Sequence, residues 1–128
     1  YTTRKEEKIQ LLLAVDIGNT NTKIAIADGH NVLHEWRIST DSKRTGDEYF
    51  SILRPLIRDA EIDVKKIDSA ILSSVVPLLI GPFVTVTERI TGKKPIIIDS
   101  FGVRVFRKNY YLCVNWNLQV KPKTLYYV

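Results

Sequence analysis

The sequence predicts a mixed α/β fold, in which an antiparallel three-strand meander is followed by alternating helices and strands that form one sheet with helices packed on it. Two patterns lead to this prediction. Apolar runs separated by turn residues occupy the first part of the chain, and strand-like and helix-like periods then alternate as far as residue 98. The length of 128 residues and the hydrophobic fraction of 45% suit one domain, or one half of a larger domain, with a real core.

The meander is expected between residues 11 and 38. Leu11 to Val15 is entirely apolar, which indicates a buried strand, and residues 22–27 alternate as a second strand does. Asp28 followed by Gly29 is a strong signal for a hairpin turn. Residues 31–38 then form the third expected strand, with one face made of Val32, His34, Trp36 and Ile38.

The first helix is expected to begin after Thr45, because Thr45 and Glu48 have the spacing of a capping box. A period of about 3.6 residues continues through the apolar positions Tyr49, Ile52, Leu53, Leu56, Ile57 and Ala60. Pro55 lies inside this pattern and removes one backbone donor, so we expect the helix to be kinked or split there.

The remaining elements alternate. Residues 66–73 predict a strand, residues 73–77 a loop, and residues 95–98 a last strand that ends at Asp99. Between them, a second helix is expected to start near Pro82 and to stop at Gly92. Its apolar face would consist of Phe83, Val86, Thr87 and Ile90.

Charge divides the chain into three parts. Residues 1–10 read as a charged leader, and residues 11–103 as the folded unit. Residues 1–103 contain 14 basic and 14 acidic side chains, so the net charge of +5 belongs to residues 104–128, which contain five basic residues and no acid. We expect this last part to be an irregular basic tail. A nucleic-acid-binding tail is the alternative, and it predicts affinity that falls steeply with salt; we expect no nucleic-acid partner.

Cellular location can be judged from apolar runs and cysteine content. Every apolar run is far shorter than the roughly 20 residues of a membrane helix, so we expect no membrane partner. The single cysteine, Cys113, suits a reducing compartment, and we predict a cytoplasmic protein. The chain contains no methionine, and we expect it to be processed or to be a piece of a longer reading frame.

The first turn contains the candidate binding residues. Asp16 ends a buried strand, Gly18 allows a close approach of backbone amides, and Lys23 lies on the strand that leaves the turn. Asn19 and Thr20 can add donors to a phosphate, Lys23 a positive charge, and Asp16 a carboxylate for magnesium. An ordinary hairpin turn with an exposed lysine is the alternative. The glycine patterns of P-loop and Rossmann sites are absent from the sequence.

Four segments in order resemble the type III pantothenate kinases, which belong to the acetate and sugar kinase, Hsp70 and actin superfamily. They are Leu12 to Lys23, Glu35 to Thr40, Arg44 to Tyr49 and Ser73 to Pro77. The resemblance implies an actin-like (ribonuclease H-like) fold, with residues 11–103 as the first nucleotide-binding subdomain. It also implies ATP-dependent phosphorylation of pantothenate, which is the first step of coenzyme A biosynthesis, in a family that forms homodimers.

The resemblance also implies roles for single residues. Asp16 would be the magnesium-site residue, and Gly18, Asn19, Thr20 and Lys23 would contact phosphates of ATP, while a monovalent cation such as potassium is a further expected cofactor. The loop at Ser74 and Val75 would lie beside the same cleft, although an ordinary strand-to-helix loop is as good an interpretation. No ligand role is expected for Arg37, interpreted as an ion-pair partner, or for His30, His34 and Asp99.

The sequence also departs from the family pattern. Family members carry a Gly-x-Asp-Arg segment, whose Asp is the presumed base, and a second phosphate motif, Asp-x-Gly-Thr. Neither motif occurs in this sequence. Tyr126, Tyr127 and Val128 stand where the Gly-x-Asp-Arg segment should come. We therefore expect an N-terminal fragment with no catalytic residue of its own and no measurable kinase activity. The alternative is a non-catalytic, kinase-like binding or regulatory module, and the coding sequence on either side would distinguish the two.

Overall fold

The fold was examined in a computed structural model, which describes residues 10–28 and 31–98. The expected leader up to residue 9, the turn residues Gly29 and His30, and everything from Asp99 onward lie outside the described residues. The elements in chain order are β1 (Leu11–Ile17), β2 (Asn21–Ala27), β3 (Val32–Ser39), α1 (Gly46–Asp59), η1 (Val64–Lys66), β4 (Ile67–Ser74), η2 (Pro77–Leu79), α2 (Ile80–Thr91) and β5 (Ile96–Ile98).

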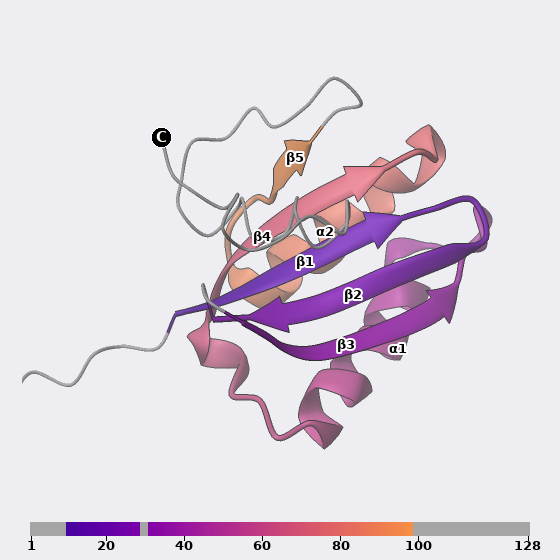
Figure 1. The fold of residues 1–128 in the computed structure, drawn as a ribbon. Coiled ribbons are helices and arrows are strands. Elements are labelled where there is room, and N and C mark those ends of the chain that lie inside the picture. Colours follow the sequence, from indigo (N-terminus) through magenta and orange to yellow (C-terminus); the bar gives the residue numbers. More distant parts are fainter. Residues whose placement is uncertain (1–9, 29–30, 99–128) are drawn as a thin grey trace, which may run out of the picture.

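The five strands form one sheet in the order β3-β2-β1-β4-β5 (Figure 1). The first three strands pair antiparallel with their neighbours, whereas β4 is parallel to β1 and β5 is parallel to β4. The predicted meander followed by alternating helices and strands is therefore confirmed. Because β1 and β4 run in the same direction, their carboxyl ends meet at one edge of the sheet.

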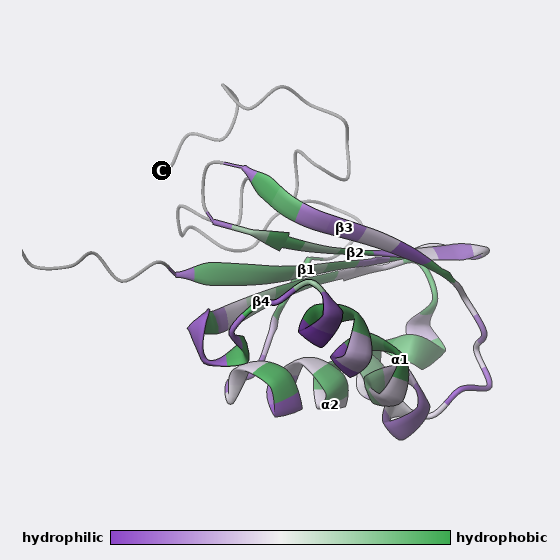
Figure 2. Ribbon diagram, turned by 90° about the horizontal axis from the view of Figure 1, so that it is seen from below, coloured by the Kyte–Doolittle hydropathy of each residue, from purple (hydrophilic) through white to green (hydrophobic). Residues whose placement is uncertain are grey.

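Both long helices cover the same face of the sheet. The connection from β3 through α1 to β4 and the connection from β4 through α2 to β5 cross the sheet in the same direction, and parallel crossovers share one handedness. Figure 2 shows α1 and α2 together below the sheet, and buried apolar residues of both helices belong to the main core. The main core lies in this layer, and its largest fully buried side chains include Tyr49, Phe83, Leu13, Ile17, Ile24, Ile26, Leu53, Ile57 and Leu72.

The opposite side of the sheet, called here the second face, is partly apolar. A smaller hydrophobic cluster lies on it, formed by Leu12, Ala14, Ala25, Ile71 and Ile98, with Val32 and Ile96 packed against it. The alternation along β1 continues this face from Ala14 to Asp16, so the second face becomes polar near the carboxyl end of the strand.

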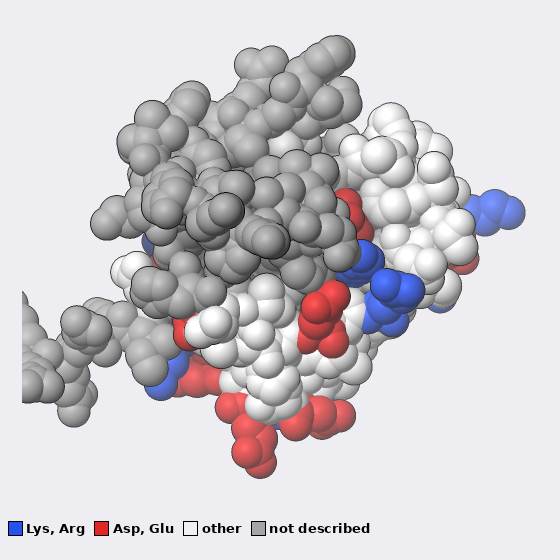
Figure 3. Space-filling view, viewed as in Figure 1, with Lys and Arg blue, Asp and Glu red and all other residues white. Residues whose placement is uncertain are grey.

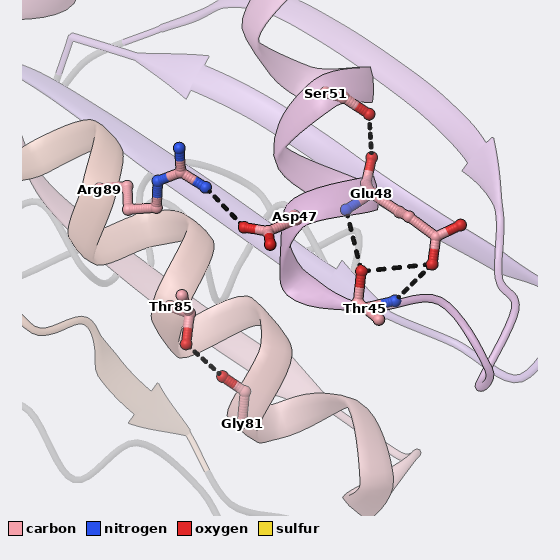
Figure 4. Close-up of polar contacts among 7 residues, drawn as sticks. All are labelled: Thr45, Asp47, Glu48, Ser51, Gly81, Thr85 and Arg89. Atoms are coloured by element: carbon pink, nitrogen blue, oxygen red, sulfur yellow. Dashed lines mark hydrogen bonds and ion pairs between the residues drawn. The ribbon is translucent and has the colours of Figure 1, made fainter.

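The helix boundaries follow local chemistry. Thr45 forms the expected capping box: its hydroxyl accepts from the Glu48 amide at 3.2 Å, and the Glu48 carboxylate accepts from the Thr45 amide at 3.0 Å (Figure 4). Of the two outcomes expected at Pro55, a kink or a split, the split is wrong, because α1 continues through this residue. The second helix begins at Ile80, two residues before Pro82, since a 3-10 turn leads into it, and it ends at Gly92 with φ of 79°.

The expected single face of β3 is also wrong. The register shifts between Ile26 and Ala27, where His34 and Val32 are the respective partners, so Leu33 is an extra residue on β3. Such a bulge moves the side chains before it to the other side of the sheet. Val32 therefore packs on the second face, while Trp36 packs against the main core.

The two helices are joined by a surface contact. Arg89 of α2 donates to the Asp47 carboxylate of α1 at 2.9 Å (Figure 4) and lies 3.8 Å above the ring centre of Phe50. Because the Asp47 side chain is 88% exposed, the ion pair contributes little to stability.

None of the described helices is long and apolar enough to cross a membrane.

Candidate phosphate-binding site

The candidate site is built on the hairpin between β1 and β2, whose turn consists of residues 18–20. The Gly18 amide donates to the Asn21 carbonyl at 2.9 Å, which closes the turn. A Cβ atom at Gly18 would lie 2.9 Å from the same carbonyl oxygen, which is closer than real Cβ contacts. The glycine is therefore required by the close approach of two backbone segments.

The tip of the hairpin is fixed to the end of β3. The Thr40 amide donates to the Thr20 carbonyl at 2.8 Å. The hydroxyl groups of Thr22 and Thr40 share a hydrogen bond of 2.8 Å, and Thr22 is fully buried. Sequence reasoning missed this pair of threonines as part of the site, although the position of Thr22 two residues before Ile24, on the buried face of β2, was a signal for it.

Asp16 and Lys23 face each other across the hairpin. They are direct partners in the β1–β2 register, so both side chains project from the second face. Partial burial raises the pKa of the Asp16 carboxyl group, and the positive charge of Lys23 opposes this rise. The structure thus brings the predicted carboxylate and ammonium together at the edge of the sheet where the turn lies.

Asn19 and Thr20 form the exposed part of the turn. Within residues 10–28 and 31–98, their side chains make no hydrogen bond, so the amide and hydroxyl groups are available to a ligand. Together with the backbone amides of the turn, they provide donors next to Lys23. Such a set of donors suits a phosphate group.

A second loop meets the hairpin at the end of β4. Ile17 is the register partner of Ser74, and the Val75 amide donates to the Ile17 carbonyl at 3.0 Å. The Ser74 hydroxyl is used within the loop, because it donates to the Val76 carbonyl and accepts from the Val76 amide, both at 2.9 Å. Ser74 therefore positions the loop, and this geometry favours the interpretation without a ligand contact.

The loop after β3 is held by a buried tyrosine. The Tyr49 hydroxyl accepts from the Asp41 amide at 3.0 Å and donates to the Asp41 carbonyl at 2.8 Å. Arg44 donates to the Ser39 carbonyl at 2.9 Å and lies 5.6 Å from the centre of the Tyr49 ring. The motif from Arg44 to Tyr49 thus fixes the segment whose Thr40 amide supports the hairpin.

The metal expectation rests on one carboxylate. Among the described residues, no cluster of three or more His, Cys, Asp or Glu side chains could hold a metal ion. A single carboxylate such as Asp16 nevertheless fits magnesium, which keeps several waters and takes its other ligands from the phosphates of a substrate. Asp16 is thus a suitable partner for a magnesium–phosphate complex, whereas the part of the chain that the structure describes forms no site made only of protein ligands.

The architecture matches solved structures that share its fold. A hexokinase of the ROK group from Thermus thermophilus matches with a TM-score of 0.53 at 14% identity over 70% of this chain and 35% of that chain. YeaZ from Pseudomonas aeruginosa matches with a TM-score of 0.52 at 11% identity over 70% of this chain and 44% of that chain. At these identities the likeness concerns the fold alone, which is the actin-like fold that the sequence predicted.

The sequence comparisons define the family. Residues 12–112 match the family model described as type III pantothenate kinase. The type III pantothenate kinase of Exiguobacterium sibiricum is 40% identical over 88 residues, which are 69% of this chain and 35% of the relative. That of Rhodospirillum centenum is 42% identical over 95 residues, which are 74% of this chain and 36% of the relative. The chain belongs to the type III pantothenate kinase family, and it spans about a third of the length of these relatives.

Proposed function

We propose that residues 10–98 form the phosphate-gripping subdomain of an enzyme that transfers the γ-phosphate of ATP to pantothenate. The hairpin geometry carries this proposal: a glycine turn with free donors lies between a carboxylate and an ammonium in direct cross-strand register. Family membership supports the substrate, because the matched relatives are named for pantothenate.

Each group has a distinct task in this proposal. The amides of Asn19 and Thr20 and the side chains of the same two residues hold phosphate oxygens, Gly18 shapes the turn that presents them, and Lys23 neutralises the phosphate charge. Asp16 would hold magnesium through water, and the bound ion would neutralise further phosphate charge and orient the transferred group. Positioning and charge stabilisation are the main sources of catalysis in phosphoryl transfer.

The described groups supply only one side of the reaction. The Gly-x-Asp-Arg and Asp-x-Gly-Thr segments of the family are absent from the 128 residues, so no residue here is assigned as the base for the pantothenate hydroxyl. We therefore propose that the chain binds phosphate-bearing ligands but does not produce phosphopantothenate alone. A requirement for potassium, a homodimeric assembly and a cytoplasmic location belong to the same proposal.

The binding test compares two lysines. ATP with magnesium is titrated calorimetrically into the 128-residue chain and into its Lys23→Ala and Lys65→Ala variants. Lys65 is a matched control, because it is an exposed lysine in η1, which precedes the amino end of β4 and is remote from the hairpin. We expect Lys23→Ala to weaken binding by roughly ten-fold, the size of one charge-assisted hydrogen bond, and Lys65→Ala to leave it unchanged.

Two results would contradict the proposal. Equal affinities of the three proteins would remove the phosphate role of the hairpin. Steady formation of phosphopantothenate by the pure chain, lost in the Lys23→Ala variant, would keep the site but overturn the assignment of the chain as inactive alone.

A further inference from the structure

A row of polar side chains crosses the second face beside the hairpin. Arg37 of β3 is the register partner of Lys23, Lys23 is the partner of Asp16, and Asp16 is the partner of Ser73 of β4. Direct partners project from the same side of a sheet, so these four side chains lie next to one another in strand order. The row therefore extends the candidate phosphate site away from the turn and across the sheet.

Two cations are adjacent in this row. The Cβ atoms of direct antiparallel partners are separated by about 4.5–5.5 Å, and like charges in such positions destabilise a sheet. Figure 3 shows basic side chains side by side on this face, with acidic side chains on both sides of them. The register itself places two acids next to these cations on the second face: Asp16, opposite Lys23, and Glu35, two residues before Arg37 on β3.

Arg37 forms no ion pair or side-chain hydrogen bond within residues 10–28 and 31–98, although Glu35 lies two residues away on the same face of β3. The sequence interpretation made it an ion-pair partner, but Arg37 forms no ion pair within residues 10–28 and 31–98. Arg37 is exposed, and no described side chain accepts a hydrogen bond from it. The interpretation of Arg37 as a structural ion-pair partner is therefore not supported within the described part of the chain.

We propose that Arg37 and Lys23 together bind one oxyanion on the second face, next to the turn of residues 18–20. This inference rests on the proposed function, because Lys23 serves both. An oxyanion placed between the two cations is attracted by both of them, and a guanidinium group suits bidentate contact with phosphate or carboxylate. The oxyanion is either a phosphate of ATP or the carboxylate of pantothenate, which share this chemistry.

The test measures binding and stability in the same proteins. ATP, inorganic phosphate and pantothenate are each titrated into the 128-residue chain and into its Arg37→Gln, Arg37→Lys and Arg58→Gln variants at low salt. Arg58→Gln is the matched control, because Arg58 is an exposed arginine in the last turn of α1. We expect Arg37→Gln to weaken one or more of the three ligands by roughly ten-fold, with partial recovery in Arg37→Lys.

Thermal unfolding separates a binding role from a structural one. Without ligand, Arg37→Gln removes one of two facing cations and should unfold at the same temperature as the parent chain or higher. A combined Lys23→Ala and Arg37→Gln variant should lose less affinity than the sum of the single losses, because both side chains contact one anion. The identity of the ligand that is weakened shows whether a phosphate or a carboxylate occupies the site.

Failure of this inference can be distinguished from failure of the proposed function. If Lys23→Ala weakens ATP binding while Arg37→Gln binds all three ligands like Arg58→Gln, the hairpin site stands and the role of Arg37 is refuted. A lower unfolding temperature of Arg37→Gln with unchanged affinities would refute it as well. If the parent chain binds none of the three ligands, both proposals fall.

Discussion

Substitution of Gly18 by alanine tests the hairpin most directly. The added Cβ atom would lie 2.9 Å from the Asn21 carbonyl oxygen, and this oxygen belongs to the backbone that accepts the Gly18 amide. Neither partner can move away without weakening that hydrogen bond. Overpacking of this kind costs about 1–3 kcal/mol, and the loss of the hydrogen bond adds about 1 kcal/mol. We therefore expect the free energy of unfolding to fall by roughly 2 kcal/mol or more.

The matched control is Gly81→Ala, in the first turn of α2. A Cβ atom at Gly81 would have no neighbour within 4 Å, and alanine favours a helix over glycine by roughly 0.5–1 kcal/mol, so this variant should be slightly more stable. Urea unfolding followed by circular dichroism measures both changes, and ATP titration reports on the turn. If Gly18→Ala unfolds at the same urea concentration as the parent chain and binds ATP equally well, the geometric requirement for glycine is wrong.

Three further predictions concern other described contacts. Thr45→Ala removes the capping box and should lower the free energy of unfolding, measured in urea, by about 1 kcal/mol. The control Thr85→Ala, at an exposed threonine of α2, should leave this free energy nearly unchanged. Equal losses in the two variants would argue against the cap. Thr22→Val breaks its bond to Thr40 and should cost about 1–2 kcal/mol, with faster amide exchange at Thr40, and unchanged exchange would count against the link. The pKa of Asp16 is raised in the fold, so the ionised carboxylate lowers the free energy of unfolding at neutral pH. Asp16→Asn should therefore be more stable than the parent chain at pH 7, and the difference should shrink as the pH falls toward about 4. A gain in stability that does not depend on pH would contradict this.

The order of elements could be predicted from the sequence because local signals agreed with one another. The apolar run from Leu11, the capping box at Thr45 and the stop at Gly92 each have a local physical cause, and all three are confirmed. The errors have physical causes too. The bulge at Leu33 depends on pairing with β2, and the continuity of α1 through Pro55 depends on tertiary packing, which a local pattern does not contain.

The candidate site was predictable to a similar extent. The sequence placed Asp16 and Lys23 on the two strands that flank one turn, and the structure makes them direct register partners. The contribution of Thr40 was not predictable, because it comes from a strand end that is distant in sequence and reaches the turn only through the sheet. The neighbouring position of Arg37 likewise depends on the β2–β3 register, which the sequence left open.

The hairpin turn is attached at two separate places to its neighbours, through the Thr20 carbonyl on one side and the Ile17 carbonyl on the other. A loop held in this way keeps its shape before a ligand arrives, so little conformational entropy is lost on binding. In the proposed kinase, the movements that admit and release substrates would then have to occur elsewhere. The turn itself would act as a rigid reference point against which other parts of the enzyme close.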